Sequence, residues 1–194
     1  MSVAANLWAS VRGYVVLALL CGGIYSLVVW GVAQGFFSAT ANGSLIVQHG
    51  QVIGSRWIEQ GWSGPEWFHG RPSATTPTPY NAANSGATNL GPTNPALIKE
   101  VEDNLSQYTH EGIAAADVPP DLVESSGSGL DPFISPASAL VQVPIVAQAR
   151  HLPPAQLRAL VARYTQKAWL GMYGAPGVNV LQLNLALGRL VSGG

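Results

Sequence analysis

Residues 14–37 read YVVLALLCGGIYSLVVWGVAQGFF, a stretch without a single charged side chain. About 20 apolar residues are enough to cross the hydrocarbon core of a bilayer as a helix. A helix is also the form in which one segment satisfies all its own backbone polar groups in lipid. Aromatic side chains stand toward the ends, where membrane helices favour them: Tyr14, Trp30, Phe36 and Phe37. The stretch therefore predicts a membrane-spanning helix.

Two other interpretations of this stretch remain open. Ala39-Thr40-Ala41 offers the small-residue pattern of a signal-peptide cleavage site, although the apolar part of a signal peptide is usually about 7–15 residues long. A helix buried in a soluble core is the other alternative, but such helices are usually shorter than this stretch. The length and composition favour a retained single-span anchor.

The charges that flank the stretch predict its orientation and the limits of the domains. Arg12 lies just before it, and the next charged residues are Arg56 and Glu59. Because positive residues stay on the cytoplasmic side, we expect residues 1–13 in the cytoplasm and residues 14–37 in the membrane. Residues 38–44 (SATANGS) then form a linker. Residues 45–194 form one soluble domain, which this orientation places outside the cytoplasm.

Composition limits what the soluble domain can do. The chain has 194 residues and a formal net charge of −1, so nothing in its charge indicates a nucleic-acid partner. Its one cysteine, Cys21, lies in the apolar stretch, which excludes an intrachain disulfide and a cysteine metal site. The part after the stretch is long enough to bury one core.

Patterning along the soluble part predicts a loop-rich α+β domain. Alternating apolar residues predict short strands within 45–62, whereas 63–95 is too rich in Pro, Gly, Asn and Ser for a helix or a central strand. That segment still holds aromatic residues, which indicates a long ordered loop rather than a linker. Val118–Val123 predicts an edge strand or an extended segment, because Pro119 and Pro120 cannot donate to a strand ladder.

Helix-start signals mark the remaining elements. Asn94-Pro95 and Ser135-Pro136 each pair a capping residue with proline at the first helical position. Apolar spacing predicts a further helix from Pro154 to about Lys167. Residues 178–187 alternate like a strand, but Asn179 as a cap and the many leucines favour a helix.

One glycine-rich turn is the strongest candidate for binding chemistry. Residues 125–129 read SSGSG, and glycines allow backbone N–H groups to converge on an anion such as a phosphate. The lysine and the following Ser or Thr of a P-loop are missing, so a purely structural turn is the alternative.

No pattern in the sequence predicts a catalytic centre or a metal site. The four histidines (His49, His69, His110 and His151) lack metal-ligand spacing, and there is no Gly-x-Ser-x-Gly motif. The neighbouring carboxylates Glu100, Glu102 and Asp103 fall on a charged helix face. We therefore expect no catalytic residues and no metal ligands.

Several ordered blocks nevertheless resemble one family, the C subunit of the Kdp-type potassium-transporting P-type ATPase. They come in the family's order and cover most of residues 68–187. The blocks are FHGRPSA (68–74), YNA (80–82), SG (85–86), NLGP (89–92) with NP (94–95), SGSGLDP (126–132) with ISP (134–136), QVP (142–144), Ala147, AR (149–150), and VNVL (178–181) with LNLAL (183–187).

The resemblance implies a non-catalytic subunit of a bacterial inner-membrane complex. Its partners would be a channel-like potassium-binding subunit, the P-type ATPase subunit and a small single-span subunit. The family member is described as a catalytic chaperone that raises the affinity of the ATPase subunit for ATP. No cofactor would be bound tightly, and ATP would be shared transiently with that subunit. The implied nucleotide contacts are Gln142 and the turn formed by Ser126, Gly127, Ser128 and Gly129.

This implied role conflicts with the predicted orientation. If Arg12 stays in the cytoplasm, Gln142 lies on the other side of the membrane from cytoplasmic ATP. Two hypotheses follow: a subunit that stabilises the complex and assists ATP binding, and a structural cap on the outer side of the potassium-binding subunit without nucleotide contact. An enzyme with its own nucleotide site and a secreted binding protein are the competing classes.

Overall fold

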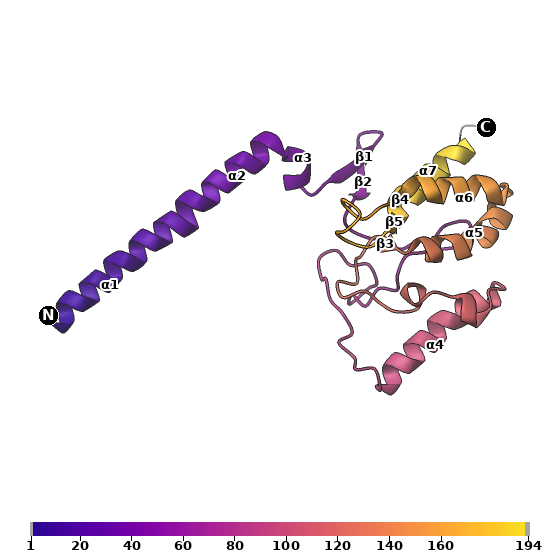
Figure 1. The fold of residues 1–194 in the computed structure, drawn as a ribbon, viewed down its shortest axis with the longest axis horizontal. Coiled ribbons are helices and arrows are strands. Elements are labelled where there is room, and N and C mark those ends of the chain that lie inside the picture. Colours follow the sequence, from indigo (N-terminus) through magenta and orange to yellow (C-terminus); the bar gives the residue numbers. More distant parts are fainter. Residues whose placement is uncertain (1, 193–194) are drawn as a thin grey trace. The chain divides into compact units, whose positions relative to one another are not determined.

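The computed structural model describes residues 2–192 and divides the chain into two units, Met1–Leu45 and Ile46–Gly194. In the first unit, α1 (Val3–Leu17), the π-helical segment η1 (Ala18–Ile24) and α2 (Tyr25–Phe36) form one continuous helix (Figure 1). This helix of 34 residues is long and apolar enough to cross a membrane. Residues 38–44, expected to be a linker, include the short helix α3 (Ser38–Ala41).

The second unit begins with a two-stranded sheet, β1 (Leu45–Gln48) and β2 (Gln51–Ser55). His49 and Gly50 connect the strands with φ angles of 52° and 78°, the left-handed region that a tight hairpin turn requires. The strands expected within residues 45–62 therefore exist only up to Ser55. Residues 56–62 form turns and loop, and Trp57 and Trp62 are partly exposed there.

A small antiparallel sheet brings together residues that are far apart in the chain. Its central strand is β5 (Gly177–Asn179), with β3 (Phe133–Ile134) on one side and β4 (Thr165–Gln166) on the other. Ile134 and Thr165 both pair with Val178, which is fully buried.

Four helices complete this unit: α4 (Pro95–His110), α5 (Pro136–Arg150), α6 (Pro154–Tyr164) and α7 (Val180–Ser192). The two predicted capping residues do cap their helices. Asn94 Oδ1 accepts from Ala96 N at 2.9 Å, and Ser135 Oγ accepts from Ser138 N at 3.1 Å. The third helix is shorter than expected, because Thr165 and Gln166 belong to β4 rather than to a helix that continues to Lys167.

Two sequence expectations about extended segments need correction. Residues 118–123 form no strand: one 3₁₀ turn, η2 (Ala115–Asp117), ends just before them, and a second, η3 (Pro120–Leu122), lies within them. Pro119 and Pro120 begin the turn η3 instead of lying in an edge strand, and the side chain of Leu122 is buried in the core. Residues 177–192 contain both predicted forms in succession, a three-residue strand followed by the helix α7.

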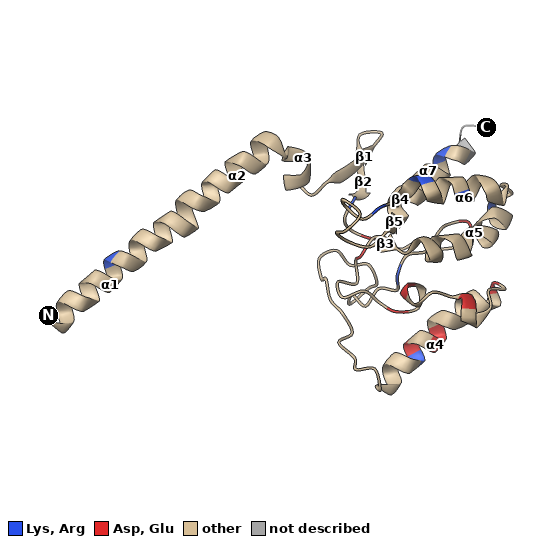
Figure 2. Cartoon of the chain, in the orientation of Figure 1, with Lys and Arg blue, Asp and Glu red and all other residues tan. Residues whose placement is uncertain are grey.

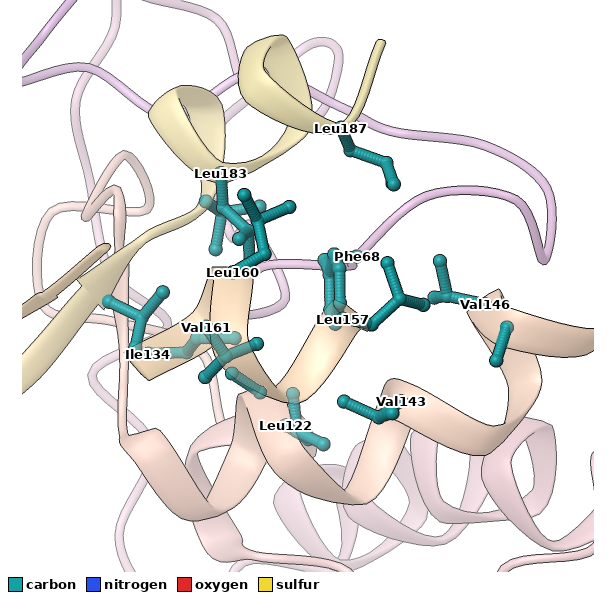
Figure 3. Close-up of a cluster of buried hydrophobic side chains, with 14 of the residues drawn as sticks. Phe68, Leu122, Ile134, Val143, Val146, Leu157, Leu160, Val161, Leu183 and Leu187 are labelled. Atoms are coloured by element: carbon teal, nitrogen blue, oxygen red, sulfur yellow. The ribbon is translucent and has the colours of Figure 1, made fainter. Parts of the chain in front are cut away.

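The hydrophobic core of the second unit lies between α5, α6, α7 and the small sheet (Figure 3), and Phe68 of the long loop, the η3 region and Tyr108 of α4 also contribute to it. Phe68, from the long loop, is fully buried among the helices, and the last helix contributes Leu183 and Leu187. The other large buried side chains come from the remaining elements: Leu122, Ile134, Val143, Val146, Leu157, Leu160 and Val161.

Candidate functional site

The glycine-rich turn lies in a network of loops. The Ser128 carbonyl accepts from Gly86 N at 2.9 Å and from Ser85 Oγ at 3.0 Å. Gly129 adopts a φ of +67°, and a Cβ built there would approach the Gly86 carbonyl oxygen to 2.7 Å. Only glycine therefore fits this position, and the close approach of two loops is the reason.

An open cavity of about 530 Å³ borders this turn. Three of the five predicted nucleotide contacts, Ser126, Gly127 and Ser128, line it. The N–H groups of Gly127 and Ser128 donate to no acceptor within residues 2–192, so they are free to meet an anion or water. The other lining residues are Trp57, Ile58, Arg71, Ser85, Leu130, Asp131, Pro132 and Phe133.

Arg71 also lines this cavity, and its guanidinium is already occupied by the protein. It donates to the carbonyls of Glu124 and Ser125 at 3.3–3.4 Å, and its Nη1 lies 3.9 Å from an Asp131 carboxylate oxygen. The side chain thus holds the start of the turn in place. An anion in the cavity would compete with Asp131 for the guanidinium.

Gln142, the fourth implied nucleotide contact, lies elsewhere. It is only 3% exposed on α5 and does not line the cavity. Its Oε1 accepts from His69 N at 2.8 Å, while its Nε2 donates to the His69 carbonyl at 3.1 Å and to the Ser138 carbonyl at 3.0 Å. Both ends of the amide are therefore used by the backbone of this protein.

Asn184 binds the backbone of Phe68, the residue before His69, in the same way. Its Oδ1 accepts from Phe68 N at 3.0 Å and its Nδ2 donates to the Phe68 carbonyl at 2.8 Å. Two side-chain amides, one from α5 and one from α7, thus bind the backbone of Phe68-His69 as neighbouring strands would. We call this pair, Gln142 and Asn184, the amide clamp.

A third attachment holds the same part of the long loop. Arg150, at the end of α5, donates from Nε to the Glu66 carbonyl at 2.7 Å, and its guanidinium carbon stacks 4.0 Å from the Trp67 ring centroid. Residues 56–94 contain no helix or strand, as the composition of 63–95 predicts for most of that range. Side chains from α5 and α7 make the hydrogen bonds to the loop backbone that neighbouring strands make in a sheet. The loop therefore has a fixed conformation.

The histidines and carboxylates do not converge. Within the described part of the chain, no group of three or more His, Cys, Asp or Glu residues could hold a metal ion. His69 is bound on both ring nitrogens, to the Gly64 carbonyl at 2.9 Å and to Gln107 at 3.3 Å. His49 lies in the β1–β2 turn, His110 in the last turn of α4, and His151 at the end of α5.

Glu59 is a strongly perturbed acid that sequence reasoning missed. It is 1% exposed, and the Gln60 backbone and the Trp62 side chain, which favour the charged form, offset its burial only in part. Burial, with a smaller contribution from the charge of Asp131, raises the pKa of Glu59 from its ordinary value of 4.5 to about 8. The carboxyl is therefore mostly protonated at neutral pH. No motif surrounds it that would have singled it out.

Comparison with known proteins identifies the family. Residues 7–189 match the family model KdpC, described as the K+-transporting ATPase, c chain. A potassium-transporting ATPase KdpC subunit from Methylobacterium nodulans is 51% identical over 187 residues, which cover 91% of this chain and 92% of that protein. The proteins of the same name from Paraburkholderia phytofirmans and Geobacter sulfurreducens are 49% and 47% identical, covering 93% and 91% of this chain and 94% of each relative. The chain therefore belongs to the KdpC family, the c chain of K+-transporting ATPases.

Proposed function

We propose that this chain is a non-catalytic subunit that stabilises the assembly of a potassium-transporting ATPase in the bacterial inner membrane. Residues 14–37 would span the membrane, with residues 1–13 in the cytoplasm and the domain 45–194 outside. Its partners would be the channel-like potassium-binding subunit, the P-type ATPase subunit and the small single-span subunit. Family membership and the apolar 34-residue helix support this role.

The amide clamp favours the structural version of this role. A glutamine that recognised a nucleotide would need a free oxygen or a free N–H group, whereas both atoms of the Gln142 amide bind the backbone of His69. Freeing them would leave polar backbone groups without partners, which is costly. In this version Gln142 fixes the long loop, and the loop presents a rigid surface to a neighbouring subunit.

The catalytic-chaperone role remains a second candidate because of the turn. The N–H groups of Gly127 and Ser128, at the rim of the 530 Å³ cavity, donate to no acceptor in the described part of the chain, and Arg71 lines the same cavity. Such donors suit the phosphates of a nucleotide. This version requires the turn, rather than Gln142, to make the nucleotide contact.

One matched pair of variants separates the two versions. Gln142→Ala and Asn184→Ala each remove half of the amide clamp, but only Gln142 is implicated in nucleotide contact by the resemblance. ATP hydrolysis by the purified whole complex is measured against ATP concentration. The structural version predicts the same KM for ATP in both assembled variants. A KM raised by Gln142→Ala alone would overturn it.

Orientation is tested independently. In a Cys21→Ser background, Ala82→Cys places a single thiol on an exposed position of the long loop. A membrane-impermeant maleimide should label this thiol in right-side-out vesicles and leave it unlabelled in sealed inverted vesicles. Labelling of the inverted vesicles would place the domain in the cytoplasm and restore access to ATP.

A further inference from the structure

A short apolar projection connects β4 to β5. We call residues Trp169–Tyr173 the apolar tip. Its four large side chains are between 63% and 75% exposed: Trp169, Leu170, Met172 and Tyr173. Exposed apolar side chains that lie this close together often mark a surface that contacts a partner or a membrane.

The apolar tip is an ordered hairpin. Trp169 N donates to the Tyr173 carbonyl at 2.8 Å, Tyr173 N donates back to the Trp169 carbonyl at 3.0 Å, and the two ring centroids lie 5.7 Å apart. Leu170 and Gly171 form the turn with φ angles of 52° and 72°. Met172 N also donates to the Trp169 carbonyl at 3.1 Å, so Leu170 and Gly171 are the central residues of a tight turn with two consecutive positive φ angles, as in a type I′ turn, inside a three-residue loop.

Leu170 is an unusual residue for that turn position. Asn, Asp or Gly occupies it in most hairpins because the left-handed region is unfavourable for other side chains. Burial cannot explain a leucine here, since 68% of it is exposed. A strained, exposed, apolar residue at the outermost point of a hairpin indicates a binding function.

The charge distribution indicates what the tip binds. All ten acidic residues precede residue 132, whereas the chain after Asp131 carries only basic charges. Figure 2 shows the acidic segments on α4 and the loops, and basic segments on α6 and α7. Lys167 lies just before the tip and Arg163 in the last turn of α6; both are exposed and form no ion pair with a carboxylate of residues 2–192.

We propose that the apolar tip inserts into the interfacial layer of a bilayer that carries anionic headgroups. Trp and Tyr favour the headgroup depth, and the leucine and methionine at the turn reach the acyl boundary. Lys167 and Arg163 add attraction to anionic lipid. A convex hairpin whose side chains are exposed suits a fluid layer, which needs no preformed groove. The proposal rests on the membrane anchorage proposed above.

The test uses the full chain, reconstituted alone in liposomes. In a Cys21→Ser background, Met172→Cys carries an environment-sensitive fluorophore at the tip, and Glu102→Cys carries it on the exposed face of α4 as the matched control. Lipids with a headgroup-depth quencher should quench the probe at 172 and leave the probe at 102 unaffected. Quenching at 172 should be strong with phosphatidylglycerol present and weak in pure phosphatidylcholine. Lys167→Gln should lower the ratio of docked to free tip about fivefold.

Each other outcome overturns the proposal in a recognisable way. A probe at 172 that stays in water with every lipid excludes the bilayer. Shielding only after the other subunits are added assigns the tip to a protein partner. Shielding that rises with the protein-to-lipid ratio assigns it to a second copy of the chain. Carbonate extraction of the chain from the liposomes would instead refute the anchor itself, which separates failure of the proposed function from failure of this inference.

Discussion

Replacing Gln142 by leucine tests the amide clamp with little change in side-chain shape. The substitution leaves a side chain of similar size on α5. It removes the acceptor for His69 N and the donor for the His69 carbonyl. A buried polar group left without a partner costs about 1–3 kcal/mol. His69 is half-buried and water can reach part of it, so we expect a loss of about 2–3 kcal/mol in the free energy of unfolding.

Asn184→Leu makes the same change on a site that is fully buried. Phe68 and Asn184 are both 0% exposed, so no water replaces the lost bonds and the expected loss rises to about 3–5 kcal/mol. Gln148→Leu is the matched control, because this glutamine lies on the same helix and is exposed. Its effect should stay within about 0.5 kcal/mol.

Two measurements check this ranking on the full chain in detergent micelles. Urea unfolding followed by tryptophan fluorescence gives the free energies. Hydrogen exchange of the His69 amide should accelerate about 30-fold or more in Gln142→Leu, since 2 kcal/mol or more of local protection is removed. If Gln142→Leu behaves like Gln148→Leu in both measurements, the clamp does not hold the loop and the structural argument for Gln142 fails.

Three further predictions use single positions. Because the folded pKa of Glu59 is raised to about 8, folding binds a proton above pH 4.5, so stability should fall as pH rises from about 4.5 through 8. Glu59→Gln should flatten that dependence by a few kcal/mol, and an unchanged slope in urea unfolding between pH 5 and 9 would contradict it. Gly129→Ala should cost about 2–4 kcal/mol through its φ of +67° and the nearby Gly86 carbonyl, whereas Gly127→Ala, with open space around it, should be nearly neutral in the same assay. Gly22→Arg places a charge in the middle of the apolar helix at a cost of about 3 kcal/mol and should prevent insertion, while Gly13→Arg should not, as carbonate extraction of membranes would reveal.

The predictions that the structure confirms rest on local signals in the sequence. The helix starts at Asn94-Pro95 and Ser135-Pro136 follow from the capping side chain and the fixed φ of proline, both properties of a few adjacent residues. The apolar stretch at the N-terminus is equally local. The prediction of a strand at residues 118–123 was wrong because consecutive prolines suit an extended strand and a 3₁₀ turn alike. The packing of Leu122 decides between the two.

The candidate site depended on contacts that no local pattern reveals. Gln142 binds a backbone 73 residues away, and nothing near it in sequence indicates that partner. Asn184 could have been suspected, since an amide among alternating leucines on a buried helix face must find a hydrogen bond. The turn Ser126–Gly129 was recognised from its glycines, yet the need for Gly129 comes from the approach of Gly86.

The Asn184–Phe68 contact also affects how the chain is made. The ribosome releases Phe68 well before Asn184, 116 residues later, and at about 5–20 residues per second the delay is roughly 6–23 s. Until Asn184 is made, α7 cannot bind the Phe68 backbone, so the aromatic segment lacks half of the amide clamp and stays open to proteases and holding chaperones. Nascent chains that stop before α7 should therefore be degraded rather than assembled.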